Sequence, residues 1–419
     1  MNPRERGFRH GSIWLGAAVV GVAAVLYAEL VRFVQENFFS HFAASPYLVS
    51  LASPLLFVAA TYLVRVLAPD AKGSGIPQVL EAIECEKKGP DTDRSSELVS
   101  IQTAIVKVAS STLGILGGAS IGREGPTVQI AASVFAWVGR RVRKYSPRVD
   151  MPSFLTAGAA AGVAAAFNTP LAGITFAIEE VAEGVLGSFR QAMTLAVIIS
   201  GITAQALLGD YLYFGHPVVA KPELSLIYES VLIGATGGLA GGVFARLLAF
   251  PALVRLPKHW ARRALICGIG CALIGLLSHG ATAGSGYEAT RNVLMAPDLS
   301  TASILFPVLK FATTVLSYLS GMAGGIFSPS LSIGAGIGIS IAKIFSLANF
   351  KACALIGMVA FFSGVVQAPL TAVIIVTEMT DEHILILPLL VASYLGQAMG
   401  KVLMPIPLYR FLADRKQEG

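Results

Sequence analysis

The chain contains little charge for its length. Only 13% of its 419 residues are charged, 54% are hydrophobic, and the mean hydropathy is +0.69. Because soluble domains carry about 25% charged residues, this composition excludes a soluble globular protein. It indicates a polytopic membrane protein with the lipid bilayer as a partner, and the 43 glycines suit closely packed transmembrane helices.

Cysteine and histidine are also scarce. The four cysteines include no CxxC pair, and the six histidines do not cluster in the sequence. Cys267 and Cys271 share a helical face without a neighbouring histidine or acid, so we interpret them as packing residues. The metalloprotease motif HExxH does not occur either. These absences argue against metal catalysis, and we expect no metal site and no cofactor.

One motif offers an enzymatic alternative. Residues 118–122 (GASIG) formally match the nucleophile motif GxSxG, which requires a strand before its turn. An apolar helical segment precedes Ser120 instead, and no histidine lies near it in the sequence. A distant histidine could still approach Ser120 in the fold, but we expect that the protein is not an enzyme.

Apolar segments follow one another along nearly the whole chain. Many are shorter than the ~20 residues of a full membrane span, and glycine, proline and serine interrupt them. This pattern is typical of transporters, in which broken, tilted helices line a protected site. The predicted segments are 12–35, 47–68, 98–116, 127–139, 153–167, 170–182, 189–208, 226–254, 260–279, 301–321, 330–346, 352–366, 369–379 and 384–404. The clearest polar loops are predicted at 87–97, 145–152, 210–224 and 287–301.

Basic residues form three groups, which predict the topology. They are Arg4, Arg6 and Arg9, then Arg140, Arg141, Arg143, Lys144 and Arg148, and finally Arg410, Arg415 and Lys416. By the positive-inside rule all three groups face the cytoplasm, so both termini are expected there. The apolar run after His10 lacks a convincing cleavage site and is interpreted as a retained first span. We expect no nucleic-acid partner for this charge.

The chain contains an internal repeat. Residues 106–126 align without gaps to 309–329, and seven of the 21 positions are identical. Residues 168–180 also match 367–379, and Gly-Ser-Gly occurs in both halves, so that the three pairs have offsets of 203, 199 and 211. We therefore predict one transmembrane transport domain over residues 1–419, with halves at approximately 12–208 and 226–404 and a short tail at 405–419. Duplicated halves place a substrate site at their interface, although the alignment leaves open whether they are inverted or parallel.

The stretch from Gly117 to Gln129 combines a predicted helix start with charge. Pro126 suits the first turn of a helix, and a helix start attracts anions through its free N–H groups and its dipole. Glu124 could occupy that anion site itself, or it could simply cap the helix.

The repeat favours a functional role for two carboxylates. Glu124 aligns with Phe327 and Glu180 with Met379, so the scaffold tolerates an apolar residue at both positions. Carboxylates inside a membrane are costly and usually functional, whereas Glu179 recurs as Glu378 and is interpreted as structural.

Two further stretches have the same design as the first. Residues 73–77 (GSGIP) place the Ser74 hydroxyl before a proline, and residues 325–329 (GIFSP) offer backbone amides without charge. Taken singly, each is as consistent with an ordinary N-cap or a glycine bend. Three glycine-rich helix starts that end in proline favour a convergent anion cradle, and neutral donors can hold an anion without trapping it.

These three motifs resemble the filter motifs of the CLC family of chloride channels and chloride/proton antiporters. Residues 168–180 and 407–409 also resemble that family, so the resemblance covers most of the chain. It implies an all-α polytopic membrane protein with two inverted repeats, of the prokaryotic type without C-terminal regulatory domains. It further implies a homodimer with one pathway per subunit in a bacterial inner membrane. One departure is Ser328, where alanine is frequent in the family.

The resemblance also implies roles for single residues. The hydroxyls of Ser74 and Tyr409 and the amides of Ile326 and Phe327 would bind chloride. Glu124 would be the gating glutamate, and Glu180 the inner residue that transfers protons. The corresponding motif residues are Gly73, Ser74, Gly75, Ile76, Pro77, Gly122, Arg123, Glu124, Gly125, Pro126, Gly325, Ile326, Phe327, Ser328 and Pro329.

Chloride/proton antiport is therefore the expected function, with chloride and protons as transported ligands. Typical channels of the family have an apolar residue at the position of Glu180, which favours exchange over passive conduction. A passive anion channel remains an alternative, as does an exchanger that prefers fluoride or nitrate.

Overall fold

The computed structural model describes residues 3–89, 93–145, 150–181, 190–209, 212–219, 224–296, 298 and 302–415. Parts of all four predicted polar loops lie outside these residues, as do Arg148 and Lys416. The side chains of Arg4, Arg6 and Arg9 also lie outside the described part. The structure thus covers every motif residue named above.

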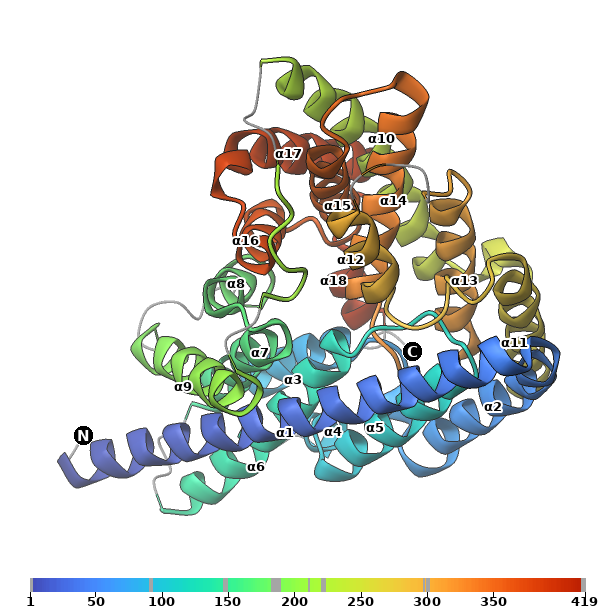
Figure 1. Ribbon diagram of the computed structural model, residues 1–419. Helices are drawn as coiled ribbons and strands as arrows, with labels where there is room; N and C mark the ends of the chain where they lie inside the picture. Colours follow the sequence, from blue (N-terminus) through green and yellow to red (C-terminus); the bar gives the residue numbers. More distant parts are fainter. Residues whose placement is uncertain are drawn as a thin grey trace.

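The described chain is helical throughout (Figure 1), and its backbone pairing outside helices consists of two isolated bridges. The first half contains α1 (Pro3–Ala44), α2 (Pro46–Leu67), α3 (Ile76–Lys88), α4 (Asp93–Leu98), α5 (Ile101–Leu116), α6 (Glu124–Tyr145), α7 (Met151–Phe167), α8 (Pro170–Phe176) and α9 (Arg190–Leu208). The second half contains α10 (Ser225–Ala249), α11 (Trp260–Leu277), α12 (Tyr287–Met295), α13 (Phe306–Ser320), α14 (Phe327–Phe345), α15 (Phe350–Val366), α16 (Pro369–Thr380), α17 (Ile386–Leu403) and α18 (Leu408–Asp414). Short helical turns lie at Pro69–Ala71, Ala177–Val181, Pro251–Val254 and His383–Leu385.

The helices have the apolar character of membrane segments. Among the described residues, seven helices are long and apolar enough to cross a membrane, and further apolar helices are shorter. The interior is formed by α15 and its neighbours, and nearly every residue of α15 is buried. The observed helix bounds lie within a few residues of most predicted apolar segments. The protein is therefore an all-α polytopic membrane protein, as predicted.

The two halves repeat one packing scheme. Helix α6 packs on α7 as α14 packs on α15, and α1 packs on α9 as α10 packs on α17. The halves meet where α2 lies beside α11 and where α8 lies beside α16 (Figure 1). Each matched pair combines one helix of the first half with its repeat partner, which is the contact pattern of a two-fold relation.

Reciprocal hydrogen bonds mark the same relation. The Gly122 amide donates to the Gly325 carbonyl at 2.8 Å, and the Gly325 amide donates to the Gly122 carbonyl at 2.9 Å. This bridge is antiparallel, so the corresponding segments run in opposite directions where they meet. The halves are inverted repeats, which resolves the alternative that the sequence left open.

Two predicted polar loops contain helices, and that part of the prediction was wrong. Helix α12 occupies most of the predicted loop 287–301, and it buries Thr290 and Leu294 on one face. Helix α4 lies within the predicted loop 87–97, where Arg94 forms ion pairs with Asp70 and Glu81. Tertiary contacts stabilise both short helices, although their average polarity resembles that of a loop.

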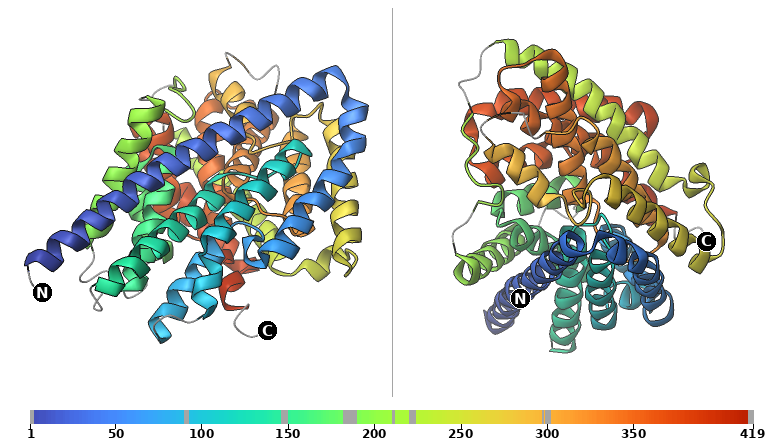
Figure 2. Two further views of the ribbon diagram at one scale, coloured as in Figure 1. Left: turned by 90° about the horizontal axis from the view of Figure 1, so that it is seen from below. Right: turned by 45° about the vertical axis from the view of Figure 1, so that its right-hand side comes forward.

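Both described ends of the chain lie on one side of the molecule. In the left view of Figure 2 they lie at the lower edge together with the C-terminal end of α6, whereas α1 ends at the upper edge. The C-terminal end of α6 carries Arg143 and Lys144. The two described termini thus share a side with one of the basic groups.

Candidate ion-binding site

Three helix starts meet at the centre of the molecule, and glycines allow them to touch. A methyl group on Gly125 would lie 2.3 Å from the Ser74 hydroxyl oxygen, so α3 and α6 begin in direct contact. A methyl group on Gly325 would lie 3.1 Å from the Gly125 nitrogen, which brings the start of α14 to the same point. The predicted convergence of the three motifs is therefore present in the structure.

The start of α14 offers backbone amides with no backbone acceptor among the described residues. Ile326 is its N-cap residue and Phe327 is its first residue, where no earlier helical carbonyl can accept the amide hydrogen. Both side chains are buried, and the Phe327 ring packs on Phe362 at 4.2 Å and on Phe167 at 4.9 Å. The amides thus lie in an apolar shell, in which an anion would interact strongly with them. Ser328 follows and is buried too.

Two buried hydroxyl groups lie next to each other near these helix starts. Ser74 is 1% exposed and Tyr409, from the first turn of α18, is fully buried. The two hydroxyls are neighbours, but neither oxygen forms a hydrogen bond with protein atoms in the described residues. Because buried polar groups are almost always satisfied, two unsatisfied donors side by side fit a ligand that accepts hydrogen bonds.

The loop that carries Ser74 is held by a buried lysine. Gly73 and Gly75 flank the serine with φ values of +66° and +102°, which glycine adopts without steric cost. The Lys107 ammonium donates to the Gly73 carbonyl at 2.9 Å. In the second half, Lys310 donates to the Gly284 carbonyl at 2.8 Å. The two lysines occupy equivalent positions in the aligned repeats, and each one holds a loop in its own half.

Glu124 is the first residue of α6 and is 1% exposed. Its Oε1 accepts a hydrogen bond from the Tyr213 hydroxyl at 3.3 Å. Its Oε2 lies against Gly122, where a methyl group would approach it to 2.2 Å. The carboxylate therefore folds back over the Gly122–Gly325 bridge, beside the helix starts that form the cradle.

Glu180 lies in the π-helical turn that follows α8, and it is 2% exposed. Such single π turns occur frequently at functional sites. The sequence predicted Glu180 and Glu124 as a functional pair, and both side chains are buried.

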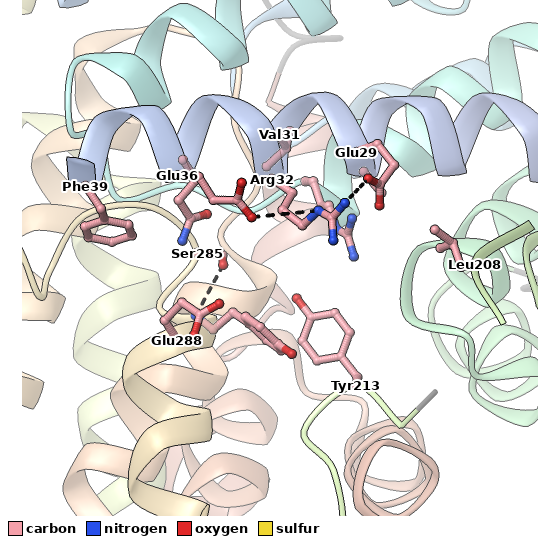
Figure 3. Close-up of a pocket in the computed structure, with 13 residues that line it drawn as sticks. Glu29, Val31, Arg32, Glu36, Phe39, Leu208, Tyr213, Ser285 and Glu288 are labelled. Atoms are coloured by element: carbon pink, nitrogen blue, oxygen red, sulfur yellow. Dashed lines mark hydrogen bonds and ion pairs between the residues drawn. The ribbon is translucent and has the colours of Figure 1, made fainter. Parts of the chain in front are cut away.

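A pocket of about 290 Å³ lies on the Glu124 side of the cradle, and we call it the α1 pocket (Figure 3). Arg123 and Tyr213 line its floor, and α1 contributes Glu29, Arg32 and Glu36. Figure 3 shows these three α1 side chains pointing into the pocket, with Arg32 between the two carboxylates. The pocket therefore reaches Arg123, the chain neighbour of Glu124, and Tyr213, its hydrogen-bond partner.

A second pocket of about 290 Å³ lies on the Glu180 side, and we call it the α18 pocket. Glu84 and Lys88 of α3 line it together with Glu180, and α18 contributes Arg410 and Asp414. None of the described residues that line it also lines the α1 pocket. The two pockets are therefore separate, one lined by Arg123 and Tyr213 beside Glu124 and the other by Glu180.

Tyr213 is the residue that sequence reasoning missed. It lies in the predicted loop 210–224, which carries no motif, and its role depends on a contact with Glu124 across 89 positions of sequence. The repeat could not identify it, since the aligned segments do not include that loop. Only the folded arrangement reveals the contact.

Comparisons with known proteins agree on one family. Residues 55–401 match the family model described as voltage gated chloride channel. The chain is 33% identical to the H(+)/Cl(-) exchange transporter ClcA of Yersinia pestis bv. Antiqua (strain Angola), over 97% of this chain and 89% of that protein. It is 32% identical to the ClcA of Vibrio parahaemolyticus serotype O3:K6, over 98% and 91%.

Solved structures share the fold. A slow cyanobacterial Cl-/H+ antiporter superposes with a TM-score of 0.85 at 25% identity, over 100% of this chain and 99% of that one. A eukaryotic CLC transporter gives a TM-score of 0.80 at 22% identity, over 98% and 75%. A CLC-type fluoride/proton antiporter gives 0.77 at 22% identity, over 98% and 99%. At this identity the last two support the fold alone.

Proposed function

The chain belongs to the voltage-gated chloride channel family, and on that premise we propose that it exchanges chloride for protons across a membrane. The observation that carries this proposal is a pair of buried carboxylates on either side of one anion cradle. Glu124 lies toward the α1 pocket and Glu180 toward the α18 pocket. Relatives named as H(+)/Cl(-) exchange transporters support the same function.

Chloride binds in the cradle between Ser74 and Tyr409. The two hydroxyls donate to the anion, and the amides of Ile326 and Phe327 donate from the start of α14. These donors are neutral, so they replace water around the ion without holding it as tightly as a buried cation would. The neutral donor set therefore suits rapid passage.

Glu124 competes with chloride for the path. The charged carboxylate is attracted to the same helix starts that attract an anion. A proton removes that charge and weakens the attraction, so chloride displaces the neutral side chain. Each time Glu124 takes up a proton, leaves the anion site and returns to it, one proton and an anion can be exchanged in opposite directions.

Glu180 delivers protons on the other side. It lines the α18 pocket and is also buried, so it can collect protons from water in that pocket and pass them toward Glu124. Chloride need not follow this branch, because its donors lie at Ser74 and Tyr409. The two ions therefore share the part of the pathway near Glu124 and follow separate routes near Glu180.

The protein is a multi-pass membrane protein, and we place it in a bacterial inner membrane with both termini in the cytoplasm. Arg143 and Lys144 lie on the side of the two described chain ends, as the positive-inside rule requires of a cytoplasmic face. The α18 pocket then opens to the cytoplasm and the α1 pocket to the outside. We propose a homodimer with one pathway per subunit, on the strength of the family alone.

A flux assay in liposomes tests the exchange. Vesicles filled with high chloride are placed in low chloride at equal pH, with potassium and valinomycin holding the voltage at zero. Chloride leaving the vesicles should drive protons inward against the pH gradient that develops. Chloride efflux without proton entry would contradict exchange and favour a passive channel, and replacing chloride with fluoride or nitrate tests the anion.

A further inference from the structure

Tyr213 closes the α1 pocket above Glu124. The tyrosine belongs to the described segment 212–219, which lies between α9 and α10. Tyr213 itself is buried, with 4% of its surface exposed. Its ring contacts Tyr287 at 4.9 Å, Phe214 at 5.0 Å and Phe167 at 5.8 Å, all nearly edge to face. Figure 3 shows the ring below α1, with its hydroxyl directed toward the pocket.

The hydroxyl reaches the carboxylate that the exchange depends on. It donates to Glu124 Oε1 at 3.3 Å, while Glu124 Oε2 is confined against Gly122. The Arg123 guanidinium lies 5.9 Å from the centre of the Tyr213 ring. Tyr213 therefore separates the charged pocket from the carboxylate and holds one of its two oxygen atoms.

The second half of the chain fixes the position of Tyr213. The amide of Phe214 donates to the Met379 carbonyl at 3.1 Å, near the end of α16. Two residues further on, His216 lies 3.7 Å from Asp381, at the end of the same helix. The segment that carries Tyr213 is thus attached to the end of α16.

We propose that Tyr213 is a positioning residue that holds charged Glu124 over the cradle and thereby sets the pH at which exchange begins. This inference rests on the proposed exchange of chloride for protons. The charged carboxylate accepts the phenolic hydrogen more strongly than the neutral acid does. The hydrogen bond therefore favours the charged, blocking form, and we expect its loss to let exchange begin at higher pH.

The sign and size of the effect follow from the contact. Removing a donor to the charged form shifts proton uptake toward alkaline pH. The distance of 3.3 Å is longer than the usual range for O–H···O bonds, so the bond is weaker than most charge-assisted ones. We expect a shift of about 0.5 to 1 pH unit.

The variant Tyr213→Phe tests the proposal because it keeps the ring and removes only the hydroxyl. Chloride-driven proton uptake is measured in vesicles over a series of pH values from acidic to alkaline. The pH at which the rate is half-maximal should rise by about 0.5 to 1 unit. The matched control is Tyr228→Phe, which removes a hydroxyl from an exposed ring on α10, outside the residues that line both pockets. Its pH of half-maximal rate should equal that of the wild type.

A second variant separates positioning from a general structural effect. In a Glu124→Gln background, Tyr213→Phe should leave the pH dependence of chloride flux unchanged, because no carboxylate remains to be held. Three results would each overturn the proposal. They are an unshifted Tyr213→Phe profile, an equal shift in Tyr228→Phe, and a Tyr213→Phe shift that persists in the Glu124→Gln background. Wild-type vesicles that move chloride without protons would overturn the exchange itself, which is a distinguishable result.

Discussion

At the scale of residues, two adjacent carboxylates have different environments. Glu179 accepts hydrogen bonds from the amides of Leu370 and Thr371 at the start of α16. Glu180 lines the α18 pocket. Both lie in the same π turn, so Glu179 has a structural role and Glu180 is the one that we propose to act in transport.

Glu180→Gln should suppress proton flux and spare chloride flux. Glutamine keeps the size of the side chain but cannot release a proton, and the proposed chloride donors lie elsewhere. Parallel recordings of chloride efflux and pH in the same vesicles would check this. If both fluxes fell together, Glu180 would instead have a role in folding or packing.

Glu124→Gln should uncouple the two ions. The amide is permanently neutral, so chloride passes without waiting for a proton, and proton movement stops. The ratio of chloride to protons transported is the quantity to measure. An unchanged ratio would contradict the gating role of Glu124.

Candidate site residues could be proposed from the sequence, whereas their contacts could not. Ser74, Glu124 and Phe327 were identifiable because helix-start chemistry and the repeat point to them. Tyr213 and the contacts of Arg94 were not, because each depends on side chains that only the tertiary structure brings together. Local patterns encode helix starts, whereas they do not encode contacts between distant loops.

At the scale of elements, the cradle depends on close contact between helix starts. Gly125→Ala would put a methyl group 2.3 Å from the Ser74 hydroxyl oxygen and 2.8 Å from the Ser74 carbonyl oxygen. Overpacking of this kind costs about 1–3 kcal/mol. We therefore expect chloride affinity, measured by calorimetry in detergent, to fall roughly tenfold.

The control for this variant lies at the other end of α3. Gly89→Ala meets no atom within 4 Å, and it should leave chloride affinity unchanged. Circular dichroism would establish that both variants remain helical. Normal affinity in a folded Gly125→Ala protein would show that the contact between α3 and α6 does not form the anion site.

A second element-scale feature is the reciprocal capping of α8 and α16. Glu378 accepts hydrogen bonds from the amides of Leu171 and Ala172, as Glu179 does for α16. Glu378→Ala removes these bonds and should lower stability by about 0.5–2 kcal/mol, seen as a lower thermal midpoint. The ratio of chloride to protons transported by the folded protein should equal that of the wild type.

The comparison for Glu378→Ala is Glu97→Ala. The Glu97 side chain is 66% exposed in its ion pair with Arg94, and exposed pairs contribute little to stability. Its thermal midpoint should therefore stay close to that of the wild type. Equal midpoints for the two variants would contradict the capping role.

Helix positions were predictable where apolar runs are long. The segment predicted at 384–404 is α17, Ile386–Leu403, and the segment at 153–167 is α7, Met151–Phe167. The short helices α4 and α12 were missed because tertiary contacts, rather than apolar runs, stabilise them. Hydropathy thus located the membrane helices but not the short helices between them.

At the scale of the whole molecule, the proposed ion path lies where the two repeats meet. The Gly122–Gly325 bridge and the paired caps join one half to the other, and the Phe214–Met379 hydrogen bond joins the connecting segment to the second half. The first half supplies Ser74, Glu124 and Glu180, while the second half and α18 supply the amides and Tyr409. Duplication thus built the scaffold, and divergence between the halves supplied the carboxylates.

The most direct test of this account is the voltage at which chloride flux through the reconstituted protein is zero. The chloride gradient is held fixed while the pH on one side is changed. Coupled exchange predicts that the zero-flux voltage moves with the proton gradient, by an amount set by the ratio of the two ions. A zero-flux voltage that stays at the chloride equilibrium potential at every pH would contradict chloride/proton exchange.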